Sequence, residues 1–166
     1  QQVGEVYDIL DKAEKTYQEL EDNQKAAQIV IDKINSIGEV MLDSGKTIEE
    51  ARKAYDALTE EQKELVTNLD ILKQAEDKYA ELNKEYLEEQ KEKAKAELDA
   101  YKDMSEYAQA QQEELKAIIE QGKKAIDEAE SVTDITSAKE AAMKKMDEVK
   151  TREEIESGGD DSEPVT

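Results

Sequence analysis

The chain has 166 residues, of which 44 are Asp or Glu and 23 are Lys or Arg, so its formal net charge is −21. It contains no Cys, His, Trp or Phe, which excludes a zinc finger, an iron–sulfur site, a thiol nucleophile and a histidine-based triad. The negative charge repels phosphate backbones, so we expect no nucleic-acid partner. No apolar run approaches the roughly twenty residues needed to span a bilayer, so we expect no membrane span.

The first predicted element is an amphipathic helix, because apolar residues recur at mostly three- and four-residue steps from Val6 to Ile37. This stripe ends before Gly38, a residue type that favours the C-terminal end of a helix. The pattern leaves two arrangements open for residues 5–22. They either continue the helix at 24–37 or bend near Asp22 and pack back as a fourth helix.

The next segments begin at recognisable start signals. The four residues from Thr47 and the four from Thr59 both read as capping boxes, and the second predicts a short separate helix at 60–66. Asn68 is a suitable N-cap for a long helix. Residues 69–102 contain neither Gly nor Pro and are rich in good helix formers, so we expect one unbroken helix there.

The C-terminal third continues this pattern. The four residues from Asp103 predict the start of a helix that runs to about residue 130, and Thr133 or Asp134 is expected to cap a last helix. Strand-like alternation is absent, so the predicted fold class is all-α. Residues 152–166 are assigned to a flexible acidic linker because Gly, Ser, Asp and Pro dominate the end of the chain.

An internal repeat organises these helices. Residues 7–20 and 69–82 are related by an offset of 62 and share eight of fourteen positions, namely Asp8/Asp70, Ile9/Ile71, Leu10/Leu72, Ala13/Ala75, Glu14/Glu76, Tyr17/Tyr79, Glu19/Glu81 and Leu20/Leu82. We interpret residues 1–22 as the terminal helix of a preceding, truncated repeat. Two tandem three-helix bundles at 23–85 and 86–151 then share a long connecting helix, which predicts an elongated rod.

Two stretches carry a family resemblance. Residues 34–68 resemble a helical module of surface proteins from Gram-positive anaerobes, many from the gut. Residues 94–151 look like a second module type from such proteins, and are more weakly similar to three-helix albumin-binding modules of streptococcal-type surface proteins. The resemblance implies a secreted or cell-wall-attached multidomain protein and supplies no catalytic motif.

Acidic residues are the most abundant candidates for a site. Glu88, Glu89 and Glu92 lie at helical spacing beside Lys and Gln, which is typical of a solvated helix surface. The segment from Asp43 faintly resembles a calcium loop, but its third and twelfth positions are Gly45 and Ala54, which cannot supply side-chain ligands. Asp160 and Asp161 could bind calcium weakly, although a linker charge pair is the preferred interpretation. We therefore expect no metal and no cofactor.

The seven tyrosines are the only aromatic residues. We expect four of them to lie at core edges with the hydroxyl in water, namely Tyr17, Tyr55, Tyr79 and Tyr101. Tyr86 and Tyr107 instead form a candidate partner-binding patch, because aromatic side chains are enriched at interface hot spots. Gly122, inside a good helix, either allows a close helix–helix approach or is a tolerated weak point.

The sequence therefore predicts a monomeric, non-enzymatic helical spacer, extracellular or associated with the cell wall. Its partners are expected to be neighbouring domains of the same polypeptide. The alternative is a three-helix module that binds a host protein such as albumin or immunoglobulin.

Overall fold

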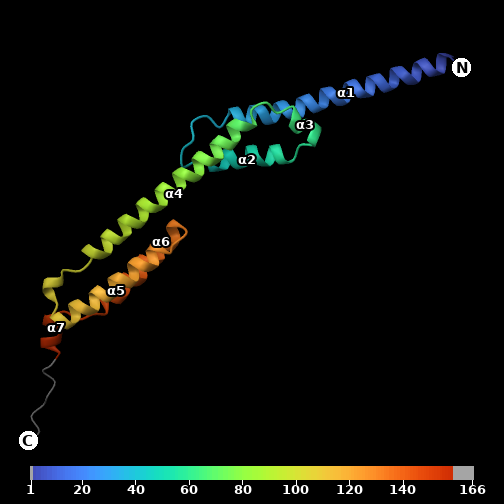
Figure 1. Cartoon of the computed structure of the whole chain (residues 1–166). Coiled ribbons are helices and arrows are strands. Elements are labelled where there is room, and N and C mark those ends of the chain that lie inside the picture. Colours follow the sequence, from blue (N-terminus) through green and yellow to red (C-terminus); the bar gives the residue numbers. More distant parts are fainter. Residues whose placement is uncertain (1, 159–166) are drawn as a thin grey trace, which may run out of the picture. The chain divides into compact units, whose positions relative to one another are not determined.

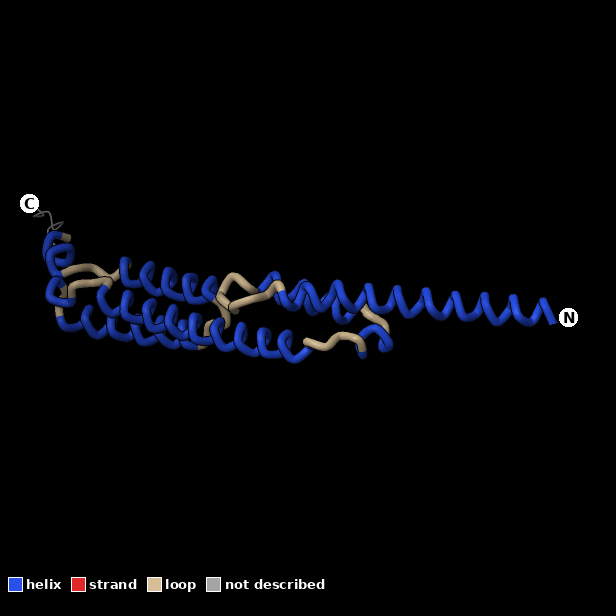
Figure 2. The backbone as a smooth tube through the Cα atoms, turned by 90° about the horizontal axis from the view of Figure 1, so that it is seen from above, coloured by secondary structure: helices blue, strands red, loops and turns tan. Residues whose placement is uncertain are grey.

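The computed structural model describes residues 2–158, and this part of the chain consists of helices joined by loops, without a strand (Figure 1; Figure 2). The all-α prediction is confirmed. The chain divides into two compact units, one ending at Asn83 and the other beginning at Lys84.

Four helices contribute to the first unit: α1 (Gln2–Asn35), α2 (Gly45–Asp56), α3 (Glu60–Glu64) and the first part of α4 (Leu69–Ala100). Helix α1 is continuous, so residues 5–22 extend the helix at 24–37 and do not fold back. Helix α2 runs back along α1 (Figure 1). The buried core of this unit consists of Ala27, Val30, Ile34, Ile37, Ile48, Ala51, Val66, Leu72 and Ala75.

Gly38 allows the chain to leave α1. Helix α1 ends at Asn35, and backbone hydrogen bonds close a further turn as far as Ile37. Gly38 then adopts a φ of 62°, in the left-handed region that a side chain disfavours. The predicted role of Gly38 at the end of this helix therefore agrees with its backbone conformation.

The two predicted capping boxes of this unit have different outcomes. Thr59 forms one: its hydroxyl accepts from the backbone N–H of Gln62, and the Gln62 side chain accepts from the N–H of Thr59. The prediction at Thr47 is wrong, because α2 begins two residues earlier at Gly45. The cause is a preceding turn in which the N–H of Met41 donates to the Ser44 hydroxyl at 2.9 Å.

Asn68 precedes α4 as predicted, but its side chain does not cap the helix. The Asn68 Oδ1 atom accepts no hydrogen bond from the described residues. Its Nδ2 donates to the Ile31 carbonyl at 3.0 Å and to Asn35 Oδ1 at 2.9 Å. The side chain therefore joins the start of α4 to the end of α1.

The second unit contains the rest of α4, the 3₁₀ turn η1 (Met104–Glu106), α5 (Gln109–Asp127), α6 (Val132–Asp147) and α7 (Arg152–Ser157). Helices α5 and α6 pack against each other over much of their length. The buried core of this unit consists of Ala94, Leu98, Tyr107, Leu115, Ile119, Ile126, Ala129, Ile135, Ala142, Met146 and Val149.

Helix starts in the second unit differ from the predicted positions. The Asp103 carboxylate accepts from the N–H of Ser105, but it caps only η1. The backbone is extended at Tyr107, so α5 starts later than predicted. Ser131 caps α6 by accepting from the N–H of Asp134, which places both predicted caps, Thr133 and Asp134, inside the helix.

Part of the predicted linker at 152–166 is helical. Residues Arg152–Ser157 form α7, and Thr151 and Glu154 make a capping box at its start. The capping hydrogen bonds satisfy amide groups that would otherwise lack partners at the helix N-terminus. Asp160 and Asp161 lie outside the described residues.

Gly122 allows close packing in the second unit. A Cβ atom at this position would lie 2.7 Å from the Ala142 Cβ and 2.9 Å from a Leu98 methyl carbon. We expect Gly122→Ala to introduce strain of about 1–3 kcal/mol, which exceeds the gain of about 1 kcal/mol in helix propensity. Urea unfolding should show a less stable second unit. Gly4→Ala is the control, because a Cβ at Gly4 meets nothing within 4 Å. A stabilised Gly122→Ala variant would contradict this prediction.

Candidate functional site

The predicted patch of Tyr86 and Tyr107 is wrong in one of its two members. Tyr107 is 3% exposed and belongs to the core of the second unit, whereas Tyr86 is 38% exposed. Sequence spacing placed Tyr107 on a helix, but its backbone is extended and its side chain is buried. The two rings therefore do not form a shared exposed surface. Of the two, only Tyr86 is exposed enough to contact a partner.

The four tyrosines predicted at core edges also differ among themselves. Tyr55 and Tyr79 are half-buried against the first core, as predicted. Tyr101 is partly exposed, and its hydroxyl donates to the Asp147 carboxylate at 3.1 Å. Tyr17 contradicts the prediction because 69% of it is exposed.

Tyr17 belongs to a row of exposed apolar residues on α1 in the first unit. We call this surface the α1 apolar face. It consists of Val3, Val6, Leu10, Ala13, Tyr17 and Leu20. These residues alternate three- and four-residue steps, which places them along one side of the helix. The same steps lead on to Ala27 and Ile34, which are buried in the first core. One side of α1 is therefore covered in its second half and uncovered in its first half.

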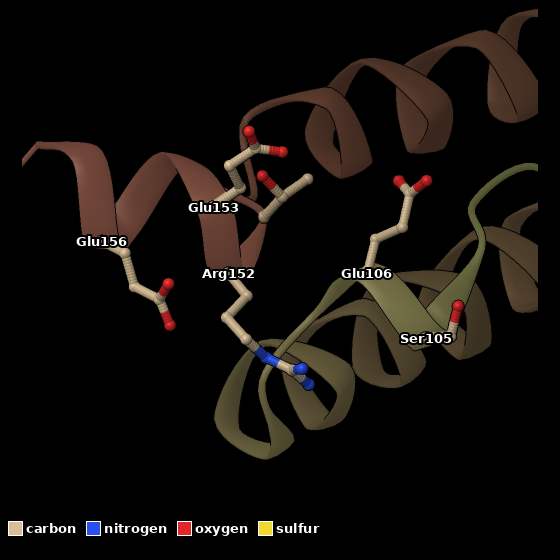
Figure 3. A pocket seen from close by; sticks show the side chains of 6 residues that line it. Ser105, Glu106, Arg152, Glu153 and Glu156 are labelled. Carbon is tan, nitrogen blue, oxygen red and sulfur yellow. The ribbon is translucent and has the colours of Figure 1, made fainter.

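A polar hollow of about 310 Å³ lies between η1 and α7. Figure 3 shows the Arg152 side chain directed towards η1, with Glu106 beside it and Glu153 on the other side of the hollow. An Arg152 guanidinium nitrogen donates to the Tyr107 carbonyl at 3.2 Å. Hydrogen bonds from Thr151 lower the pKa of the neighbouring Glu154. The Arg152 hydrogen bond ties α7 to the end of η1, whereas the Thr151 contacts stabilise the start of α7.

An arginine joins two helices of the first unit. Arg52 on α2 donates two hydrogen bonds to the Glu76 carboxylate on α4, each 2.6 Å long. The Arg52 guanidinium also lies 5.6 Å from the centre of the Tyr55 ring. Both partners of the ion pair are less than one-third exposed, which favours a stronger contact than a surface pair makes. Sequence spacing did not identify this contact, because it joins residues on different helices.

The Arg52 contact predicts a pH dependence of stability. The Arg52 hydrogen bonds lower the pKa of Glu76 below its ordinary value of 4.5. Because the folded-state pKa is lowered, the stabilisation is fully present above about pH 4.5 and is lost as pH falls through the folded-state pKa. We expect the unfolding free energy of the original chain to exceed that of Glu76→Gln at pH 7, and this difference to disappear at low pH. Urea unfolding from pH 7 to pH 3 measures it. Asp77→Asn, at the neighbouring exposed position of α4, is the control. A pH-independent difference would contradict the assignment.

Other carboxylates pair with lysines across helices of the second unit. Lys139 lowers the pKa of Glu97, and Lys102 lowers that of Asp147. Glu88, Glu89 and Glu92 lie exposed on α4, as expected for a solvated helix surface.

Residues 2–158 contain neither a metal-binding cluster nor a membrane span. Residues 2–158 contain no group of three or more acidic, Cys or His residues placed to hold a metal ion. The segment from Asp43 enters α2 at Gly45 and so forms a helix start. None of the helices in the described range has the length and apolar character of a membrane span.

Comparisons of the chain with protein-family models, curated proteins and solved structures find no match. The resemblance to surface-protein modules therefore stays a prediction from the residues. The candidate functional features are the α1 apolar face, the Arg52–Glu76 pair and the long helix α4.

Proposed function

We propose that this chain is a non-catalytic helical spacer of a bacterial surface or secreted multidomain protein. It holds neighbouring domains of the same polypeptide apart. Helix α4 carries this proposal: Leu72 and Ala75 lie in the first core, and Ala94 and Leu98 lie in the second. A helix shared by two cores cannot be removed from either without loss of packing.

The spacer requires length and stiffness. Helices α1 and α4 have 34 and 32 residues. At 1.5 Å per residue each is about 50 Å long, so an end-to-end arrangement would reach about 100 Å. We propose that the two units form such a rod as tandem three-helix bundles. The repeat at 7–20 and 69–82 supports a series of similar units.

The charge supports a monomer in an extracellular or cell-wall setting. A net charge of −21 makes chains repel one another, which disfavours self-association. The resemblance of residues 34–68 to surface-protein modules is the support for the location.

Small-angle X-ray scattering in solution tests the rod. A compact domain of this length has a radius of gyration of about 15 Å, whereas a rod of about 100 Å has one near 30 Å. Measurements should be made at several salt concentrations, because charged particles repel at low ionic strength. A value near 15 Å together with native helicity in circular dichroism would overturn the proposed spacer.

Binding of a host protein such as albumin or immunoglobulin is the second candidate. It is favoured only by the partly exposed ring of Tyr86 on α4. Serum pull-down with the full chain and with Tyr86→Ala tests it. Capture of albumin or immunoglobulin that the substitution abolishes would support binding. Absence of a retained protein would leave the spacer proposal.

A further inference from the structure

The two copies of the internal repeat are buried to different extents. Leu10 and Leu72 are equivalent, yet Leu10 is 52% exposed and Leu72 is fully buried. Tyr17 is likewise exposed, whereas its equivalent Tyr79 packs against the first core. Because the local sequences match, the difference lies in what covers them.

Specific contacts show which helices cover the second copy of the repeat, residues 69–82. Tyr79 lies against Gly45 at the start of α2 so closely that a Cβ there would collide with the Tyr79 hydroxyl. Glu76 accepts the two hydrogen bonds from Arg52. Residues 24–35 of α1 contribute Val30 and Ile34 to the same core. Within residues 24–66, the second half of α1 and helix α2 thus form a helix pair that covers the repeat at 69–82.

The first copy, residues 7–20, has the same side chains that contact the helix pair in the second copy. It has the same leucine, alanine and tyrosine positions along the α1 apolar face. Glu14 is the equivalent of Glu76, and within residues 2–158 it has no ion-pair or hydrogen-bond partner. The uncovered copy therefore presents an apolar stripe beside a carboxylate that lacks its arginine.

We propose that the α1 apolar face is a docking surface for a helix pair of the same sequence type as residues 24–66. The pair comes from a preceding repeat unit of the same polypeptide. Its arginine binds Glu14, and a glycine at the start of its second helix faces Tyr17. The source of the pair rests on the proposed spacer role, whereas the docking chemistry rests on the repeat.

A second copy of this chain fits the surface less well. Residues 2–22 contain seven acidic and two basic residues, so two α1 apolar faces that approach each other bring like charges together. This segment also contains no arginine to pair with Glu14. A helix pair of the 24–66 type supplies that arginine at a fixed position.

The test extends the full chain by the missing cover. Residues 24–68 are fused directly before Tyr7 of residues 7–166, because residue 69 is equivalent to residue 7 and the register is kept. Hydrogen–deuterium exchange with mass spectrometry then reports on residues 7–20. We expect exchange there to be at least about 100-fold slower than in the original chain, since a docked helix exchanges only by opening.

Variants of the extended chain test the specific contacts. Leu10→Asp should abolish the slow exchange in the extended chain and leave the original chain unchanged. Glu14→Gln and Gln at the grafted counterpart of Arg52 should each speed exchange by about tenfold, and the double variant should add little to either. An additive double variant would overturn the proposed pairing.

The remaining outcomes are also decisive. Equally fast exchange of residues 7–20 in both chains would overturn the docking surface. Slow exchange in the original chain, together with a dimer in sedimentation velocity, would identify a second copy as the occupant and also overturn the proposal. Equally fast exchange does not alter the radius of gyration of the original chain, and sedimentation velocity identifies a dimer independently of scattering. A failure of docking is therefore distinguishable from a failure of the spacer.

Discussion

Leu72→Ala is expected to destabilise the first unit by about 2–5 kcal/mol, the usual cost of a cavity at a buried leucine. The same substitution at the repeat-equivalent Leu10 is expected to change stability by less than about 0.5 kcal/mol. Leu72 is fully buried, whereas Leu10 is more than half exposed. Urea unfolding followed by far-ultraviolet circular dichroism measures both effects in the same chain.

Comparing these two variants distinguishes the effect of burial on stability from the effect of local sequence. Both leucines precede an alanine by three residues and a tyrosine by seven, so their helix propensities and neighbours are closely matched. Equal destabilisation by the two substitutions would mean that the α1 apolar face is covered in solution. Equal tolerance would contradict the first core as described.

Glu85→Pro is expected to break α4 between the two cores. Glu85 is exposed and lies between Tyr79 of the first core cluster and Leu87 of the second. Proline removes a helical hydrogen bond and clashes with the preceding turn, which costs about 3 kcal/mol or more in a helix interior. Since Glu85 lies outside both buried cores, we expect the units to remain folded while the stiffness of the proposed rod is lost.

Scattering and thermal unfolding measure the effect of Glu85→Pro. The radius of gyration should fall and the distribution of intramolecular distances should broaden, whereas helicity should decrease by only about one turn. Glu85→Ala is the control because alanine preserves the helix. An unchanged scattering profile in the proline variant would show that α4 does not carry the stiffness.

Helix existence was predictable from the sequence, whereas helix starts depended on side-chain contacts that the capping patterns do not specify. The four-residue patterns at Thr59 and Thr47 are similar, yet only Thr59 forms a capping box. The hydrogen bond between Met41 and Ser44 begins α2 earlier, and Gly45 is held against Tyr79. Neither contact is visible in the pattern at Thr47.

Periodicity predicted which side of a helix is apolar but not whether that side is covered. Leu10 and Leu72 illustrate this limit, because matched local sequences have opposite exposure. Tyr107 shows the converse error. Its burial depends on an extended residue before α5, where the Gln112 side chain donates to the Met104 and Tyr107 carbonyls. This contact spans several residues and has no simple sequence signature.

Composition misled the prediction for the segment that follows Thr151. The Gly- and Ser-rich end of the chain suggested a linker from residue 152. The capping box of Thr151 and Glu154 was present in the sequence, and Arg152 ties α7 to the Tyr107 carbonyl. A local start signal was therefore more informative than average composition.

The lysines between helices of the second unit determine how much positive charge the surface of this unit exposes to solvent. Five of them contact acidic side chains or a carbonyl on a neighbouring helix, and their side chains are only 11–26% exposed: Lys91, Lys95, Lys102, Lys123 and Lys139. Positive charge is thus partly withdrawn from solvent, and an approaching molecule meets carboxylates first. Added salt shortens the Debye length, to about 8 Å at physiological ionic strength, and so weakens the repulsion that these exposed carboxylates exert on other anionic molecules.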